Sequence, residues 1–151
     1  MKDFMAKSFS AGATSFLYKN ILNYVLYYLG LTPFLYRVEA ATLVLPLKDA
    51  NTLYGLIIGL MTDFILLGWM ALMTAYILNV TGRDYSLIKG AFVGASMWLI
   101  IYGFFVHNGM LGLYKPSGIS SSLTTLFFDI TTGIISAYVL VYIDTKHSVI
   151  K

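Results

Sequence analysis

One apolar run, residues 53–78, constrains this chain more than any other feature, because it contains a single charged side chain, Asp63. About 20 consecutive apolar residues are enough to cross the hydrocarbon core of a bilayer. An ionisable group in the middle of such a helix costs about 3 kcal/mol on insertion scales, so it usually has a partner or a task. The run therefore predicts a membrane span, and the cost of its buried charge predicts other charged groups at the same depth.

The composition supports the same fold class. Hydrophobic residues make up 58% of the 151 residues and charged residues 11%, against about 25% charged in soluble domains. We expect residues 1–151 to form one all-α transmembrane domain. The absence of cysteine excludes disulfides and thiolate metal sites. The net charge of +3 is scattered along the chain, which argues against a nucleic-acid surface. The N-terminus has no cleavage pattern, so the first helix is expected to act as an uncleaved signal anchor.

The first predicted helix, residues 8–29, is the most polar of the set. Small and polar side chains recur on it at spacings of three and four and so share one face: Ser8, Gly12, Ser15, Lys19 and Asn23, with Asn20 beside them. Small and polar residues of this kind occupy the interfaces between membrane helices. We therefore expect this face to point into the bundle.

Three further spans are predicted at residues 53–78, 86–106 and 119–143. The connection after the first helix contains an apolar stretch, residues 40–45, that is too short to cross a bilayer. It is expected to be an interfacial or partly re-entrant segment along the outer surface. The alternative is a plain extracellular loop with a few buried apolar residues.

Glycines at a spacing of four mark surfaces where helices can approach closely. Two such pairs occur, Gly55 with Gly59 and Gly90 with Gly94, and Gly133 lies on the inward face of the last helix. The spacing alone is common by chance in apolar helices. Asp63 continues the first pair by one turn, which strengthens that case and suggests that Gly59 lets the first helix approach.

Lysine and arginine near the span ends predict the orientation. With four spans, one side of the membrane receives Lys2, Lys7, Arg83, Lys89, Lys146 and Lys151. The other side receives Arg37, Lys48 and Lys115. Six basic residues against three favour cytoplasmic N- and C-termini, because cytoplasmic loops carry an excess of Lys and Arg.

Three charges are expected at the same depth. Counted from the first residue of each predicted span at 1.5 Å per residue, Lys19 lies roughly 16 Å deep, and Asp63 and Asp129 roughly 15 Å deep. We expect these three side chains to meet in the bundle interior, with Asn20, Asn23, Thr62, Thr125 and Thr132 available for hydrogen bonds. Two neighbouring carboxylates do not both ionise cheaply, so one of them is expected to hold or share a proton.

This polar core has two interpretations. In the first, the core is structural and holds the helices in one packing arrangement, as in an accessory or assembly subunit without enzymatic activity. Alternatively it relays protons in a small proton-coupled transporter or channel, since intramembrane ionisable groups are functional by default. A single four-helix bundle has no obvious lumen, so transport would require an oligomer. The expected partners are the lipid bilayer and a second copy or a larger membrane complex.

Enzymatic chemistry is not indicated. His107 and His147 fall near opposite interfaces in the predicted topology and are expected to be solvated rather than to share a haem. No metalloprotease helix, nucleophile–base pair, phosphate-binding loop or dinucleotide fingerprint is present. We therefore predict no cofactor and no metal site.

Three stretches resemble small four-span membrane proteins of Gram-positive bacteria, of the YqhR-like kind. They are the polar first helix AKSFSAGATSFLYKNILNYVLYYLGL, the connection YRVEAATLVL and the start of the third helix, LIKGAFVGASMWLIIYG. The resemblance covers most of the chain through unspecific motifs. It implies a location in the bacterial cytoplasmic membrane, and it brings no activity and no catalytic residues.

Overall fold

The computed structural model describes residues 4–32, 34–106 and 119–149, and these form helices without any strand. The long helices are α1 (Phe4–Tyr28), α4 (Leu53–Thr81), α5 (Ser86–Trp98) and α6 (Ile119–Val149). Two short helices, α2 (Tyr36–Ala41) and α3 (Leu47–Ala50), connect α1 to α4, and a π-helix, η1 (Leu99–Val106), continues α5. Three helical stretches are long and apolar enough to cross a membrane: Leu53–Thr81, Ser86–Phe104 and Ser122–Lys146.

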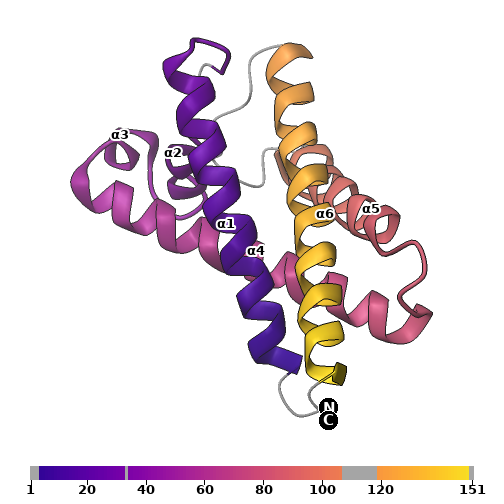
Figure 1. The fold of residues 1–151 in the computed structure, drawn as a ribbon. Coiled ribbons are helices and arrows are strands. Elements are labelled where there is room, and N and C mark those ends of the chain that lie inside the picture. Colours follow the sequence, from indigo (N-terminus) through magenta and orange to yellow (C-terminus); the bar gives the residue numbers. More distant parts are fainter. Residues whose placement is uncertain (1–3, 33, 107–118, 150–151) are drawn as a thin grey trace.

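Figure 1 shows α1 and α6 side by side, with α4 crossing them obliquely and α5 packed along α6. The beginning of α1 lies beside the end of α6, because Lys7 forms an ion pair with Asp144. Arg83, which follows α4, contacts the same carboxylate at 2.8 Å. The start of α1, the end of α4 and the end of α6 therefore meet at one end of the bundle.

Local signals explain where the helices begin and end. The Thr52 side chain accepts a hydrogen bond from the backbone N–H of Gly55 at 3.1 Å and so caps the start of α4. Gly82 follows α4 with φ of +82°, a conformation that favours glycine and stops the helix. Gly30 does the same after α1, with φ of +71°.

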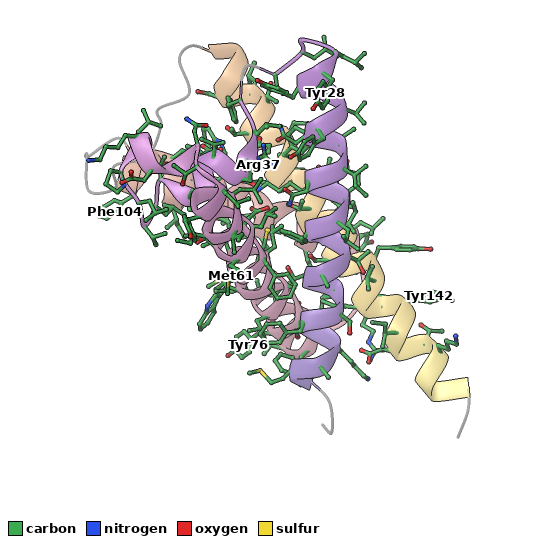
Figure 2. All side chains as sticks on the ribbon, turned by 90° about the vertical axis from the view of Figure 1, so that its left-hand side faces the viewer. Tyr28, Arg37, Met61, Tyr76, Phe104 and Tyr142 are labelled. Carbon is green, nitrogen blue, oxygen red and sulfur yellow. The ribbon has the colours of Figure 1, made fainter. Side chains whose placement is uncertain are left out.

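The inward face of α1 is the polar face expected from the sequence. Its buried residues are Ser8, Ala11, Gly12, Ser15, Lys19 and Asn23. The opposite face carries exposed apolar side chains, among them Met5, Phe9, Leu17, Ile21 and Val25. The other helices also present large apolar residues outward, as Met61 and Tyr76 do in Figure 2. The bundle thus places polar groups inside and apolar groups outside, which suits a lipid environment.

The glycine pair of α4 packs against the connection, and the expectation that Gly59 admits the first helix is wrong. A Cβ on Gly59 would lie 1.9 Å from the Arg37 carbonyl oxygen of α2, and one on Gly55 would lie 2.3 Å from the Asp49 carbonyl oxygen of α3. The close approach of α1 to α4 occurs elsewhere, where Gly12 lies against the backbone of Gly68.

The second glycine pair seats α5 on α6. A Cβ on Gly90 would lie 2.4 Å from the Gly133 carbonyl oxygen, and one on Gly94 would lie 2.0 Å from the Asp129 carbonyl oxygen. Gly133 in turn faces Gly90 across the same contact. These three glycines bring the two helix backbones together beside Asp129.

The connection between α1 and α4 lies deeper than a segment along the outer surface would. Four of the six α2 residues are buried: Tyr36, Glu39, Ala40 and Ala41. The absence of side chains at Gly55 and Gly59 lets this segment approach α4 closely. Instead of covering the bundle, α2 contributes side chains to its interior.

Candidate functional site

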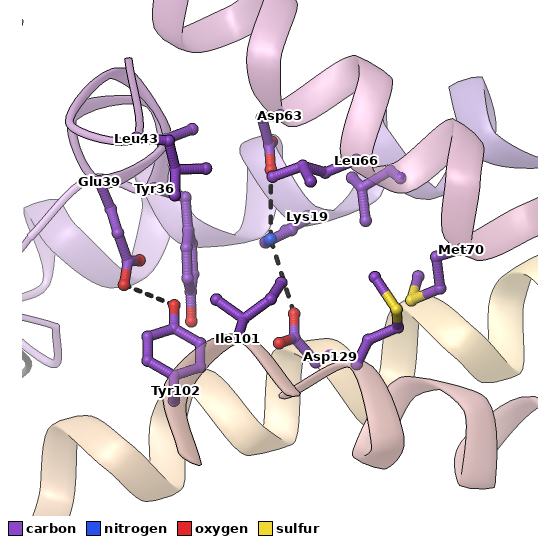
Figure 3. A pocket seen from close by; sticks show the side chains of 13 residues that line it. Lys19, Tyr36, Glu39, Leu43, Asp63, Leu66, Met70, Ile101, Tyr102 and Asp129 are labelled. Atoms are coloured by element: carbon purple, nitrogen blue, oxygen red, sulfur yellow. Dashed lines mark hydrogen bonds and ion pairs between the residues drawn. The ribbon is translucent and has the colours of Figure 1, made fainter. Parts of the chain in front are cut away.

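The buried charges predicted at one depth meet in the structure. The Lys19 ammonium of α1 lies 3.2 Å from an Asp63 carboxylate oxygen of α4 and 3.6 Å from an Asp129 carboxylate oxygen of α6. Their exposed fractions are 7%, 2% and 8%. Figure 3 shows Lys19 between the two carboxylates. The ammonium also lies 4.4 Å from the centroid of the Tyr36 ring, a cation–π distance.

The polar residues around these charges fall into two groups. Asn20 donates to the second oxygen of Asp63 at 2.8 Å and so belongs to the charge cluster. Asn23 instead holds the connection, since its side chain donates to the Phe34 carbonyl at 3.3 Å and accepts from the Tyr36 N–H at 2.9 Å.

The threonines expected near the carboxylates bond elsewhere. The Thr132 hydroxyl is within 2.9 Å of the Phe128 and Asp129 carbonyl oxygens of its own helix. The Thr125 hydroxyl accepts from the Trp98 indole N–H at 2.8 Å, which joins α6 to α5. Among the described residues, neither hydroxyl therefore forms a hydrogen bond to the carboxylates.

A third carboxylate, Glu39, joins the cluster and was not predicted from the sequence. It comes from α2, is 5% exposed, and accepts a hydrogen bond from the Tyr102 hydroxyl of η1. The signal in the sequence is the spacing of Tyr36, Glu39 and Ala40, which places them on one helical face. Without the tertiary structure, that face has no assigned neighbour.

A cavity of about 50 Å³ lies against these groups (Figure 3). Its polar lining is Lys19, Tyr36, Glu39, Asp63, Tyr102 and Asp129, and apolar residues such as Leu66 and Met70 complete the wall. A cavity needs about 10–15 Å³ for each water molecule and polar partners for it, so this space suits a few waters. The site thus combines ionisable groups with room for a hydrogen-bonded chain.

Two polar atoms of the lining have no hydrogen-bond partner in the described part of the chain. They are the Tyr36 hydroxyl and the second carboxyl oxygen, Oε2, of Glu39. Tyr36 is 3% exposed and Glu39 is 5% exposed, so both residues are buried. A buried polar atom without a partner costs about 1–3 kcal/mol. Tyr36 and Glu39 both line the cavity, so these two atoms depend on water there for their hydrogen bonds.

Burial changes the acidity of Glu39, which lies outside the three apolar helical stretches. Burial raises the pKa of the Glu39 carboxyl to about 7, while the hydrogen bond from Tyr102 and the charge of Lys19 oppose the change. Burial also raises the pKa of the Tyr36 hydroxyl, which stays protonated. The pKa of Glu39 is therefore close to neutral pH, which marks it as a candidate functional group.

Apolar layers separate the charge cluster from the end of the bundle that holds Lys7 and Asp144. One buried cluster from α1, α4 and α6 fills this interval along the helices: Ala11, Ala71, Ala75, Leu78, Ala137 and Leu140. A second apolar cluster, Phe34, Tyr36 and Phe128, lies toward the other end of α1, against Leu22 and Leu26. The charges are thus enclosed along the bundle axis, and α2 and η1 supply the remaining wall of the cavity.

The structure does not describe the side chain of either histidine. His107 lies outside the described residues, and the side chain of His147 is also outside the described part. Among the residues that the structure describes, no three His, Cys, Asp or Glu side chains are placed to hold a metal ion. Comparison of the chain with protein-family models, with curated proteins and with solved structures finds no match.

Proposed function

We propose that the chain is a four-span protein of a bacterial cytoplasmic membrane, with both termini on the cytoplasmic side. Three apolar helical stretches support three of the spans. The fourth would be α1, which has 25 residues and an apolar outward face. Lys7 and Arg83 lie at the same end of the bundle, which agrees with the excess of basic residues on cytoplasmic ends.

We infer that its function is proton binding and relay within a small proton-coupled transporter or channel, acting as an oligomer. The observation that supports this proposal is the cavity beside the charges, whose lining includes Tyr36 and Glu39. Glu39, Asp63 and Asp129 face one ammonium, Lys19, so at least one carboxyl has a reason to bind a proton. A cluster that served only to lock helices would need no cavity with room for water beside its charges.

A second candidate is a non-enzymatic accessory or assembly subunit. The observation in its favour is that Lys19 links α1 to α4 and α6, which specifies one packing arrangement. On the sequence alone this candidate ranks first. The cavity and the contribution of Glu39 change that order in favour of proton relay.

Proton flux in reconstituted vesicles separates the two candidates. We expect the wild-type protein to dissipate an imposed pH gradient, and Asp63→Asn and Asp129→Asn to abolish that activity while remaining folded. Asp84→Asn is the matched control, because Asp84 is an exposed carboxylate on the turn after α4. The pH gradient is imposed with different ions and solutes on either side of the membrane. If wild-type vesicles keep the gradient under all of these conditions, the accessory subunit is the better proposal.

The topology has its own test. Reporter fusions after Lys48, Arg83, Lys115 and Lys151 are expected to report outside, inside, outside and inside. An external signal at Lys151 would contradict the four-span arrangement with cytoplasmic termini, whatever the flux experiment shows.

A further inference from the structure

We propose that Glu39 is the group through which the buried cluster exchanges protons with the non-cytoplasmic side, with Tyr102 as its positioning residue. This inference rests on the proposed proton relay and deepens it, because it names the acid at which the relay opens. None of the three charges predicted from the sequence occupies this position in the molecule.

The first argument is the place of Glu39 in the chain. It belongs to α2, in the connection between α1 and α4, and the proposed topology puts that connection on the non-cytoplasmic side. Its side chain nevertheless lines the same cavity as Lys19, Asp63 and Asp129. On the opposite side of the cluster, the buried apolar layer that contains Ala11 and Leu140 separates these charges from the cytoplasmic end. Toward the connection, a second apolar cluster with Phe34 and Phe128 closes the bundle axis, so the polar way out of the cavity is through Glu39 of α2.

The second argument is the bonding of the Glu39 carboxyl. Its Oε1 atom accepts from the Tyr102 hydroxyl, which fixes the orientation of the group, while Oε2 is buried without a partner in the described residues. Of the two carboxyl oxygens, Oε2 is therefore the one that can carry the proton. Figure 3 shows the Glu39–Tyr102 pair on one side of Tyr36 and Lys19 on the other. The Tyr36 hydroxyl, also without a partner, lies in the same lining.

The third argument is electrostatic. The ionisable groups that share the cavity with Glu39 come from every neighbouring element: Lys19 of α1, Tyr36 of α2, Asp63 of α4, Tyr102 of η1 and Asp129 of α6. Arg37, the adjacent cation, does not pair with Glu39, because its guanidinium stacks over the Tyr24 ring at 5.2 Å. Lys19 is already held by two aspartates, so the Glu39 carboxyl favours its neutral, protonated form.

These contacts define the exchange step. A hydronium ion on the non-cytoplasmic side loses one O–H bond and leaves as water, while its proton forms an O–H bond at Glu39 Oε2 and the carboxylate becomes neutral. The same O–H bond then breaks as the proton passes through the cavity to the carboxylate of Asp129 or Asp63, and Glu39 becomes an anion again. Tyr102 keeps its own proton throughout and holds Oε1 in place.

Infrared titration of the vesicle-reconstituted protein tests this directly, because the carbonyl band of a protonated carboxyl is visible without any transport. We expect the wild type to show a component of this band that disappears as the pH rises through neutrality, and we expect that component to be missing in Glu39→Gln. Tyr102→Phe should keep the band and move its midpoint to higher pH, since the lost hydrogen bond stabilised the charged carboxylate. Asp84→Asn should leave both the band and the midpoint unchanged.

Proton flux in the same vesicles separates the role of Glu39 from the proton relay on which it rests. A loss of flux of at least tenfold in Glu39→Gln, together with the loss of the band, supports the inference. If wild-type vesicles conduct and Glu39→Gln keeps both the band and the flux, the inference is overturned while the proton relay stands. If wild-type vesicles are inert but Glu39→Gln removes the band, the relay fails and Glu39 is still supported as the proton-binding group.

Discussion

Lys19 is the side chain on which the buried cluster depends, because its ammonium contacts carboxylates from two other helices. The bond to Asp63 is the shorter of the two, and Asn20 supports the other oxygen of that carboxylate. Asp129 is held more loosely, at 3.6 Å, and borders the cavity. The two aspartates therefore have different surroundings, and double substitutions can distinguish them.

Removing Lys19 should leave the carboxylates of Asp63 and Asp129 without the buried cation that they contact. We expect Lys19→Met to lower the free energy of unfolding by about 3–5 kcal/mol, because breaking a buried pair leaves an uncompensated charge. The double variant with Asp63→Asn should be more stable than the sum of the two separate effects predicts. The double variant with Asp129→Asn should show a smaller departure from additivity than the one with Asp63→Asn. Thermal denaturation of the detergent-solubilised variants measures these differences. Strict additivity for both pairs would mean that Lys19 does not interact with either aspartate in the membrane protein.

Glu39 gives the stability a dependence on pH. Its pKa is raised by burial to about 7 from an ordinary value of 4.5, so between these values the folded state holds a proton that the unfolded state has released. The free energy of unfolding should therefore fall as the pH rises through this range. Glu39→Gln should remove that part of the slope. Denaturation midpoints measured at several pH values from about 5 to about 8 check this, and equal slopes in the two proteins would contradict it.

Among the helices, α2 depends on its neighbour for its position. The Arg37 carbonyl oxygen lies where a Cβ on Gly59 would be, so even an alanine must push α2 away from α4. That movement would also displace Glu39 and Tyr36, which are both carried by α2. The glycine spacing that the sequence presents as a general helix-packing signal thus determines where one short helix is seated.

We expect Gly59→Ala to destabilise the protein by about 1–3 kcal/mol, because the new methyl group overlaps backbone atoms that have no room to move. Gly68→Ala is the matched control in the same helix. Its methyl group would meet only the Phe9 ring, at 3.2 Å, and a side chain can rotate away. Denaturation of both variants in detergent gives the comparison, and a Gly59→Ala protein as stable as Gly68→Ala would argue against the close seat of α2.

The assembly of the whole bundle can be tested because the chain has no cysteine. The Ser15 and Ser136 hydroxyls lie 2.8 Å apart between α1 and α6, so a Ser15→Cys, Ser136→Cys protein should form a disulfide on mild oxidation. Ser10→Cys with Ser136→Cys is the control, because Ser10 is exposed on α1. Mass spectrometry after proteolysis identifies the cross-link. Cross-linking in the control pair but not in the test pair would show that α1 is rotated in the bundle.

Much of this arrangement could be predicted from the sequence, and the reason is the cost of burial. A charge within an apolar helix must find a partner, and so the depths of Lys19, Asp63 and Asp129 anticipate the contacts that the structure shows. The helical period likewise anticipates the inward face of α1, because small and polar residues recur on it. Both predictions depend on position along a single helix, which the sequence contains in full.

What only the tertiary structure decided is how separate elements meet. The π-helix η1 replaces the last part of the predicted third helix and carries Tyr102 to Glu39, and no local pattern in the sequence announces that bond. The seat of α2 on Gly55 and Gly59 is of the same kind, since a glycine surface accepts any backbone that approaches it. The partner of each surface is chosen by packing across the whole chain, and for that reason the contribution of Glu39 appeared only once the helices were placed together.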